Sequence, residues 1–202
     1  MKIKDGLKLK GRPAEIPDSY RNDLPAFFKE MGFKVGAEIG VYQGEFSEIL
    51  AKDGLKLYCV DPWADYGDYH DSGMKTRMDL FHEETKKRLA PYDCTIIRKF
   101  SEDAAKDFED ESLDFVYIDG HHGFKYVTQD IWDWYPKVKK GGVLAGHDYI
   151  FTAKKPYQLH ACHVKFVVPA ITGALGVRNW YVLGERHGEN RDPHRSWMFI
   201  KS

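Results

Sequence analysis

The sequence has little that would mark an extracellular, membrane-spanning or nucleic-acid-binding protein. It contains only three cysteines and no CxxC pair, so we expect reduced thiols and a cytoplasmic protein. The longest apolar stretch, residues 166–177, is interrupted by Pro169, Thr172 and two glycines, which makes it too short to span a bilayer. The formal net charge is only -1, so we expect neither a nucleic-acid partner nor a membrane partner.

The first 17 residues, MKIKDGLKLKGRPAEIP, also lack an apolar run, so they do not resemble a signal peptide. We interpret them as a loosely packed arm. The chain shows no internal repeat, low-complexity tract or linker, and 202 residues suffice for one domain with a real core. We therefore predict a single domain over residues 1–202. It would comprise an N-terminal arm and helix (1–34), a ligand-binding core (35–150) and a C-terminal helix and hairpin (151–202).

Short apolar runs alternate with stretches of helical periodicity through most of the chain. After residue 150 the alternation gives way to one weakly helical stretch and two strands joined by a polar loop. This order predicts an α/β fold. We expect a doubly wound, Rossmann-like and mostly parallel seven-stranded sheet with helices on both faces and a C-terminal antiparallel β-hairpin. The predicted strands are residues 35–41, 55–60, 94–99, 115–118, 143–146, 180–183 and 197–200.

Two of these strands end in the same way. Leu113–His122 reads LDFVYIDGHH, and Gly141–Tyr149 reads GGVLAGHDY, with one amphipathic stretch between them. A strand–helix–strand unit forms a right-handed crossover, so the two strands should be parallel and close in the sheet. Their carboxyl ends would share the edge at which open α/β sheets bind ligands. Five groups able to bind metal or move protons should meet there: Asp119, His121, His122, His147 and Asp148.

A glycine-containing turn follows the first predicted core strand. Ala37–Ser47 reads AEIGVYQGEFS, in which Gly40 and Gly44 would let a ligand approach the backbone. The amides that open the next helix would favour a carboxylate or phosphate. Glu38 lies at the end of the strand, and Asp61 ends the next one, where an acid commonly holds ribose hydroxyls. The dinucleotide pattern G-x-G-x-x-G is absent.

The E-x-G-x-x-x-G turn, with an acid after the second strand, resembles the class I S-adenosylmethionine (SAM)-dependent methyltransferases. The likeness extends to Ile118–Phe124 (IDGHHGF), Val127, Asp130 and the segment GGVLAGHDY. This set is similar to the branch that includes sugar and macrolide O-methyltransferases of the macrocin type and many bacterial and phage members. It covers residues 35–150 and implies a methyltransferase acting on a small-molecule acceptor, such as a hydroxyl or a sugar.

The resemblance also implies a set of residues that bind the cofactor SAM. They follow the carboxyl ends of successive strands. The implied set is Glu38, Gly40 and Gly44 for the methionine part, Asp61 for the ribose, Ser101 and Glu102 beside the adenine, and Asp119.

A divalent metal is a further implication of the resemblance. Metal-dependent relatives keep one acid after the fourth strand and two after the fifth, and Asp119 and Asp148 fit two of these three places. His147 stands in the third. We therefore predict Asp119, His147 and Asp148 as ligands of Mg²⁺ or Mn²⁺, with the histidine shifting preference away from Mg²⁺ toward Mn²⁺, Fe²⁺ or Zn²⁺.

An alcohol acceptor must lose a proton during methyl transfer, and imidazole is suited to take it. We predict Asp119, His121 and His147 as the catalytic residues. We favour His121 as the base because it lies two residues beyond Asp119, and interpret His122 mainly as a surface residue. The sequence allows a homo-oligomer.

Two other classes of function remain open at this point. His121, His147 and Asp148 could imitate the facial triad of a non-haem metal-dependent oxygenase, or serve a hydrolase. Alternatively, the fold could retain a nucleoside pocket as a binding module without catalysis.

Overall fold

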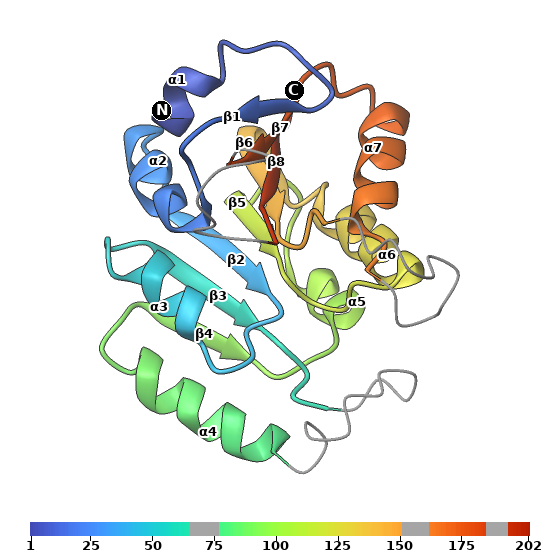
Figure 1. The fold of residues 1–202 in the computed structure, drawn as a ribbon. Helices are drawn as coiled ribbons and strands as arrows, with labels where there is room; N and C mark the ends of the chain where they lie inside the picture. Colours follow the sequence, from blue (N-terminus) through green and yellow to red (C-terminus); the bar gives the residue numbers. More distant parts are fainter. Residues whose placement is uncertain (65–76, 151–161, 185–193) are drawn as a thin grey trace.

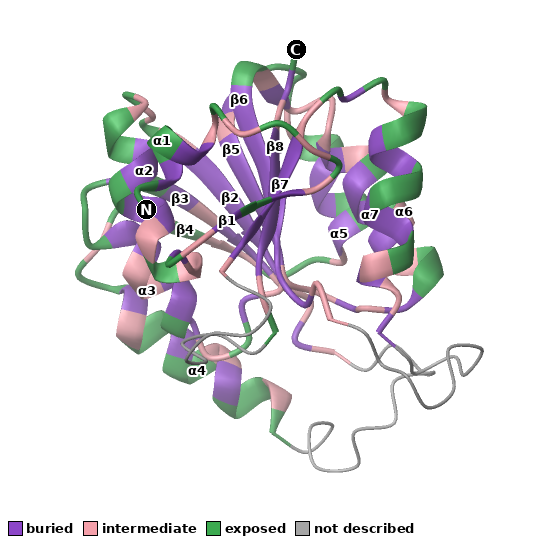
Figure 2. Ribbon diagram, turned by 45° about the horizontal axis from the view of Figure 1, so that its top comes forward, coloured by how far each residue is buried: buried purple, intermediate pink, exposed green. Residues whose placement is uncertain are grey.

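The computed structural model describes residues 1–64, 77–150, 162–184 and 194–202. Within them, eight strands form one sheet between two layers of helices (Figure 1). Helices α1 to α4 cover one face and α5 to α7 the other (Figure 2). The predicted doubly wound α/β fold is confirmed. The strands are β1 (Ala14–Ile16), β2 (Val35–Ile39), β3 (Lys56–Val60), β4 (Cys94–Ile97), β5 (Leu113–Ile118), β6 (Val138–Gly146), β7 (Trp180–Leu183) and β8 (Trp197–Ile200).

The helices follow the predicted alternation. A short 3₁₀ turn, η1, precedes α2, which begins at Leu24. Pro25 explains this, because proline fits only the first turn of a helix. The helices are α1 (Ile3–Gly6), η1 (Arg21–Asp23), α2 (Leu24–Glu30), α3 (Glu45–Ala51), α4 (Met78–Leu89), α5 (Ser101–Ala104), η2 (Ala105–Asp107), α6 (Phe124–Trp134) and α7 (Val164–Ala174).

The strand order is β1-β7-β8-β6-β5-β2-β3-β4. Strand β8 runs antiparallel to both of its neighbours, β6 and β7, and the other pairs are parallel. Ile39 at the end of β2 is level with Val60 of β3 and Ile118 of β5, and Ile118 is level with Gly146 of β6. Four chain segments therefore leave the sheet side by side at one edge, as the crossover argument predicted.

The prediction of seven strands and a loosely packed arm was wrong. Residues Ala14–Ile16 form an eighth strand, β1, which pairs in parallel with Tyr181–Leu183 of β7. Ala14 and Ile16 are buried, while Glu15 between them is exposed. The Tyr181 hydroxyl also donates a hydrogen bond to the Leu7 carbonyl at 2.9 Å. Three residues are too few to show a clear period of two in the sequence, so this docking was not visible there.

Two hydrophobic clusters fill the space between the sheet and its helices, one on each face. On the α2 side, the rings of Phe28 and Phe115 stack at 4.1 Å between centroids. On the other side Trp134 of α6 is fully buried. Both faces of the central strands are therefore covered, which explains their near-continuous apolar runs.

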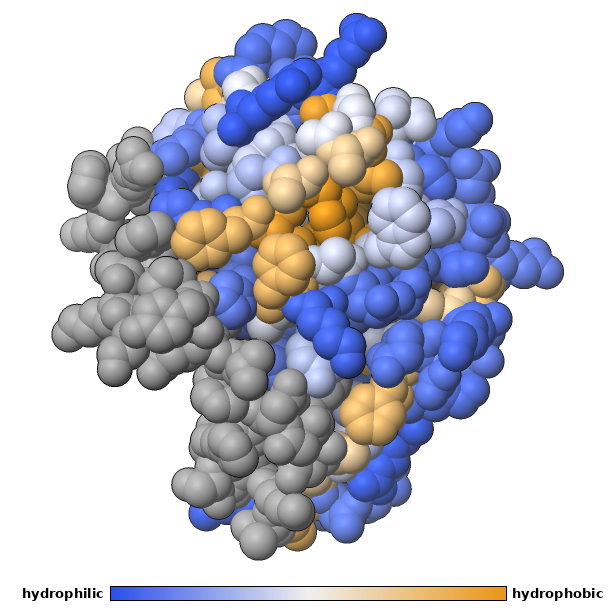
Figure 3. All heavy atoms as spheres, turned by 90° about the vertical axis from the view of Figure 1, so that its right-hand side faces the viewer, coloured by the Kyte–Doolittle hydropathy of each residue, from blue (hydrophilic) through white to orange (hydrophobic). Residues whose placement is uncertain are grey.

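The side of the molecule formed by α6 and α7 carries exposed apolar side chains. Figure 3, which shows the right-hand side of Figure 1, has one concentrated area of apolar side chains. Three large apolar residues of these helices are exposed: Phe124, Trp132 and Phe166. No helix among the described residues is both long and apolar enough to cross a membrane.

Candidate active site

The glycine turn after β2 makes direct contact with the end of β5. Gly40 and Gly44 have φ values of 88° and 77°, in the left-handed region that favours glycine. A Cβ atom on Gly40 would lie 2.2 Å from the carbonyl oxygen of Asp119. The glycine turn and the Asp119 segment thus pack against each other without room for a side chain.

Asp61 binds the backbone of this turn. Its Oδ2 accepts hydrogen bonds from the amides of Val41 at 2.9 Å and Tyr42 at 3.0 Å, and its Oδ1 accepts one from Trp63 at 2.7 Å. Burial raises the pKa of Asp61, although the three amides favour its ionised form. Asp61 therefore fixes the shape of the turn, and its predicted contact with ribose stays a prediction.

Glu38 is buried at the end of β2, with a side chain that accepts a hydrogen bond from the Ser47 hydroxyl. Burial raises the pKa of Glu38 well above its ordinary value, and the nearby charge of Asp119 adds to this effect. The Ser47 hydrogen bond and the positive charge of Arg21 act in the opposite direction. The charges of both Arg21 and Asp119 therefore influence the pKa of Glu38.

The structure separates the two residues predicted beside the adenine. The Ser101 hydroxyl is buried and accepts a hydrogen bond from Trp134 Nε1 at 2.9 Å. Glu102 is exposed and lines a groove of about 630 Å³ between α5 and α6. Ser101 holds α6 against the sheet, and Glu102 faces solvent.

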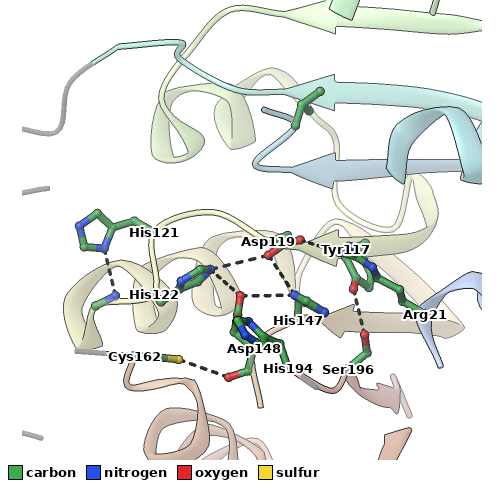
Figure 4. Close-up of polar contacts among 12 residues, drawn as sticks. Arg21, Tyr117, Asp119, His121, His122, His147, Asp148, Cys162, His194 and Ser196 are labelled. Carbon is green, nitrogen blue, oxygen red and sulfur yellow. Dashed lines mark hydrogen bonds and ion pairs between the residues drawn. The ribbon is translucent and has the colours of Figure 1, made fainter. Parts of the chain in front are cut away.

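Four of the five groups expected at the ends of β5 and β6 do come together. We call Asp119, His122, His147 and Asp148 the Asp–His cluster (Figure 4). His122 Nε2 lies 2.9 Å from Asp148 Oδ2 and 3.7 Å from Asp119 Oδ1. His147 Nδ1 lies 3.4 Å from Asp148 Oδ2 and 3.6 Å from Asp119 Oδ1. Two imidazoles therefore face two carboxylates.

The charges of the Asp–His cluster stabilise one another. Burial alone would lower the pKa of His122, but hydrogen bonds to Asp119 and Asp148 outweigh it and raise this pKa to about 9. Burial alone would raise the pKa of both aspartates, but hydrogen bonds from His122 and His147 hold these two pKa values below the ordinary range. In the structure His122 is thus a cation and both aspartates are anions at neutral pH.

One ligand atom each from Asp119, His122 and Asp148 could hold a metal ion, since all three lie within 4.8 Å of one another. The predicted set contained His147 in place of His122. His147 lies beside the same carboxylates, so both histidines border this position. A site with two carboxylates and imidazole suits Mn²⁺, Fe²⁺ or Zn²⁺ better than Mg²⁺.

His121, predicted as a base, lies apart from the Asp–His cluster and points away from it in Figure 4. Its Nδ1 accepts a hydrogen bond from the Gly123 amide at 3.0 Å, and its ring packs against Tyr126 at 4.1 Å. The chain turns between His121 and His122, so the second histidine faces the carboxylates and the first faces α6.

Two further residues reach the cluster from segments that sequence reasoning did not connect with it. His194, just before β8, places Nδ1 2.6 Å from Asp148 Oδ1. Nη1 of Arg21, in η1, lies 3.4 Å from Asp119 Oδ2. The guanidinium carbon of Arg21 lies 5.2 Å from the centre of the Phe46 ring. The basic, histidine-containing hairpin loop was a signal for His194, and no motif pointed to Arg21.

Comparison with known families identifies the chain. Residues 37–149, more than half of it, match the family model Methyltransf_24, described as a methyltransferase domain. The chain belongs to this methyltransferase family. The resemblance to class I SAM-dependent methyltransferases is thereby confirmed, and the family separates the chain from the oxygenase and hydrolase alternatives. The matched residues include the glycine turn and the whole Asp–His cluster.

Solved structures confirm the fold of this methyltransferase at low sequence identity. An O-methyltransferase from Bacillus cereus in complex with SAH is 12% identical, with a TM-score of 0.63 over 90% of this chain and 80% of that one. TomG, a SAM-bound O-methyltransferase from Streptomyces achromogenes, is 14% identical, with a TM-score of 0.59 over 90% and 79%. The N-methyltransferase NodS from Bradyrhizobium japonicum is 14% identical, with a TM-score of 0.58 over 88% and 91%.

A relative in sequence is the uncharacterised protein y4gI of Sinorhizobium fredii. It is 28% identical over a match of 123 residues, and the match covers 55% of this chain and 12% of that protein. The chain thus spans about an eighth of the length of this relative.

Proposed function

We propose that the protein is a SAM-dependent methyltransferase that methylates a hydroxyl group of a small molecule, such as a sugar. The observation that carries this proposal is the contact between Gly40 and the Asp119 carbonyl. It places a turn suited to a cofactor directly beside a cluster suited to proton transfer. Methyl transfer needs these two functions side by side, because the nucleophile must approach the methyl carbon in line with the sulfur.

The residues around the turn fit the cofactor. Gly40 and Gly44 let the turn adopt positive φ values, and Glu38 and Arg21 offer a hydrogen-bond acceptor and a positive charge to a zwitterion. Glu38 and the two glycines would hold the methionine part, and Asp61 the ribose. When bound, SAM supplies an electrophilic methyl group.

The Asp–His cluster supplies the base. With His147 Nδ1 facing Asp119 and Asp148, Nε2 of the same ring would take the proton of the acceptor hydroxyl. The two carboxylates would orient the ring and stabilise the imidazolium that forms. The acceptor oxygen would then form a bond to the methyl carbon as the C–S bond breaks and SAH leaves with its electron pair, and the proton would remain on His147 until solvent removes it.

A divalent cation would assist at the same place. Asp119, His122 and Asp148 would hold it, and it would lower the pKa of a bound hydroxyl. The donor set leads us to propose Mn²⁺ rather than Mg²⁺.

Calorimetric titration of the purified protein with SAH tests the cofactor, with NAD as the control nucleotide. We expect SAH to bind in the micromolar range and NAD not to bind; the reverse result, or no binding of SAH, would refute the proposal. Release of SAH from SAM in the presence of sugars, phenols and amines then tests the acceptor class. Hydroxyl compounds should turn over, and addition of EDTA should slow them. Methylation of amines alone would overturn the hydroxyl assignment.

A further inference from the structure

Arg21 is a cation at the proposed cofactor site that comes from outside the core. It lies in η1, before the family-matched residues 37–149. Its guanidinium contacts Asp119 and stacks over Phe46, in the first turn of the helix that follows the glycine turn. Its charge also reaches Glu38. Arg21 therefore stands over the same turn that would hold the methionine part of SAM.

The glycine turn itself is poorly equipped to bind an anion. The amides of Val41 and Tyr42 already donate to Asp61, and the Gly44 amide donates to the Val41 carbonyl. Glu38 suits the ammonium group of an amino acid, and the Asp119 anion beside the turn would repel its carboxylate. A zwitterionic ligand bound here would therefore gain affinity from a cation supplied by another segment of the chain.

Other basic side chains near the turn are engaged more strongly. Arg88 donates to the Gln43 carbonyl at 2.9 Å and to Glu48 at 3.2 Å. His122 lies 2.9 Å from Asp148. The Arg21–Asp119 contact is 3.4 Å, longer than the 2.7–2.9 Å typical of a strong charge-assisted hydrogen bond. About a third of the Arg21 side chain is exposed, so a ligand could reach the guanidinium.

We propose that Arg21 binds the α-carboxylate of the cofactor's methionine part and releases Asp119 when it does so. This inference rests on the proposed function. The planar guanidinium can form two parallel hydrogen bonds to a carboxylate, and stacking on Phe46 keeps it beside the turn. Released from Arg21, Asp119 keeps both oxygens for the Asp–His cluster.

Two ligands that differ in the amino-acid group test this assignment. SAH carries the α-carboxylate, and 5′-methylthioadenosine has the same nucleoside without it. Calorimetry would measure both ligands with the wild type, Arg21→Ala, Arg21→Lys and the control Lys8→Ala. Lys8 is an exposed cation of the same N-terminal segment, paired only locally with Asp5 in the described structure.

We expect Arg21→Ala to weaken SAH binding roughly tenfold to a hundredfold, with 5′-methylthioadenosine unchanged. Arg21→Lys should recover part of the loss, because lysine keeps the positive charge but cannot form the two parallel hydrogen bonds of a guanidinium group. Lys8→Ala should match the wild type for both ligands. An equal loss of both ligands in Arg21→Ala would show that Arg21 only seats the N-terminal segment, and no loss would also overturn the proposal. A wild type that binds neither ligand would instead refute the proposed function itself.

Discussion

The two halves of the proposed site are built in different ways. The glycine-turn half is held by backbone geometry: positive φ angles, a close approach of two strand ends, and three amides on Asp61. The Asp–His half is held by charged side chains that come from separate loops. We therefore expect the glycine-turn half to tolerate no added side-chain atoms. The Asp–His half should tolerate changes in side-chain shape, but not the loss of a charge or of a metal ligand.

The largest expected effect comes from adding a single methyl group to the turn. Gly40→Ala combines a strained φ of 88° with a Cβ placed 2.2 Å from the Asp119 carbonyl oxygen. We expect a loss of roughly 3–5 kcal/mol in the free energy of unfolding, measured by urea denaturation, together with loss of SAH binding.

Gly54→Ala is the matched control. Gly54 has a similar φ of 82°, but nothing lies within 4 Å of the added Cβ. It should lose only about 1 kcal/mol and keep its affinity for SAH. Equal losses of unfolding free energy in the two variants would mean that the close contact with the Asp119 carbonyl contributes nothing to the effect of Gly40→Ala.

A second test compares two adjacent histidines on the Asp–His side. His122→Ala removes a proposed metal ligand, and His121→Ala removes a ring that faces Tyr126. We expect His122→Ala to weaken Mn²⁺ binding at least about tenfold, since even hydrogen-bond partners of ligands contribute that much. His121→Ala should stay within about twofold. Calorimetry with MnCl₂ measures both, and a larger loss in His121→Ala would overturn the assignment of His122 as a metal ligand.

A third test concerns a buried carboxyl near the junction of the two halves, where the expected change is a gain in stability and not a loss. A Cβ atom placed on Gly120 would lie 3.6 Å from Oδ2 of Asp130. Burial raises the pKa of Asp130 to about 7, against an opposing hydrogen bond with Ser101. Because the unfolded chain releases this proton near pH 4, the folded state loses stability from this group as the pH rises from about 4 to about 7.

Asp130→Asn mimics the protonated acid and should remove that loss. Relative to the wild type, we expect the variant to gain on the order of 2 kcal/mol between pH 5 and pH 8. Urea denaturation at several pH values measures the difference between the two proteins. A difference that does not vary with pH would show that Asp130 ionises normally in the folded state.

Local patterns were sufficient to predict the central strands. Trp180–Leu183 and Trp197–Ile200 were predicted with the bounds that the structure gives. Strand β6 was predicted too short. Its first five residues, VKKGG, include two lysines and two glycines, which give no apolar signal in the sequence. The pairing of Val138 with Leu113 of β5, rather than the composition of β6 itself, extends the strand.

The site could be predicted only in part for a similar reason. Strand order placed Asp119, His147 and Asp148 at one edge, since neighbouring parallel strands end together. Which of His121 and His122 faces the cluster depends on a loop conformation that strand periodicity does not set. Arg21 and His194 arrive through tertiary packing of segments far from the core motifs, so spacing carried no information about them.

The pairing of β1 with β7 also has a consequence for how the molecule assembles. Leu7 and Tyr181 are joined across 174 residues of chain, and contacts of such high sequence separation form late in folding. During synthesis the glycine turn leaves the ribosome early, but β1 has no sheet partner until β7 and β8 have followed. The N-terminal segment that carries Arg21 can therefore settle on the sheet only after β7 and β8 have been made.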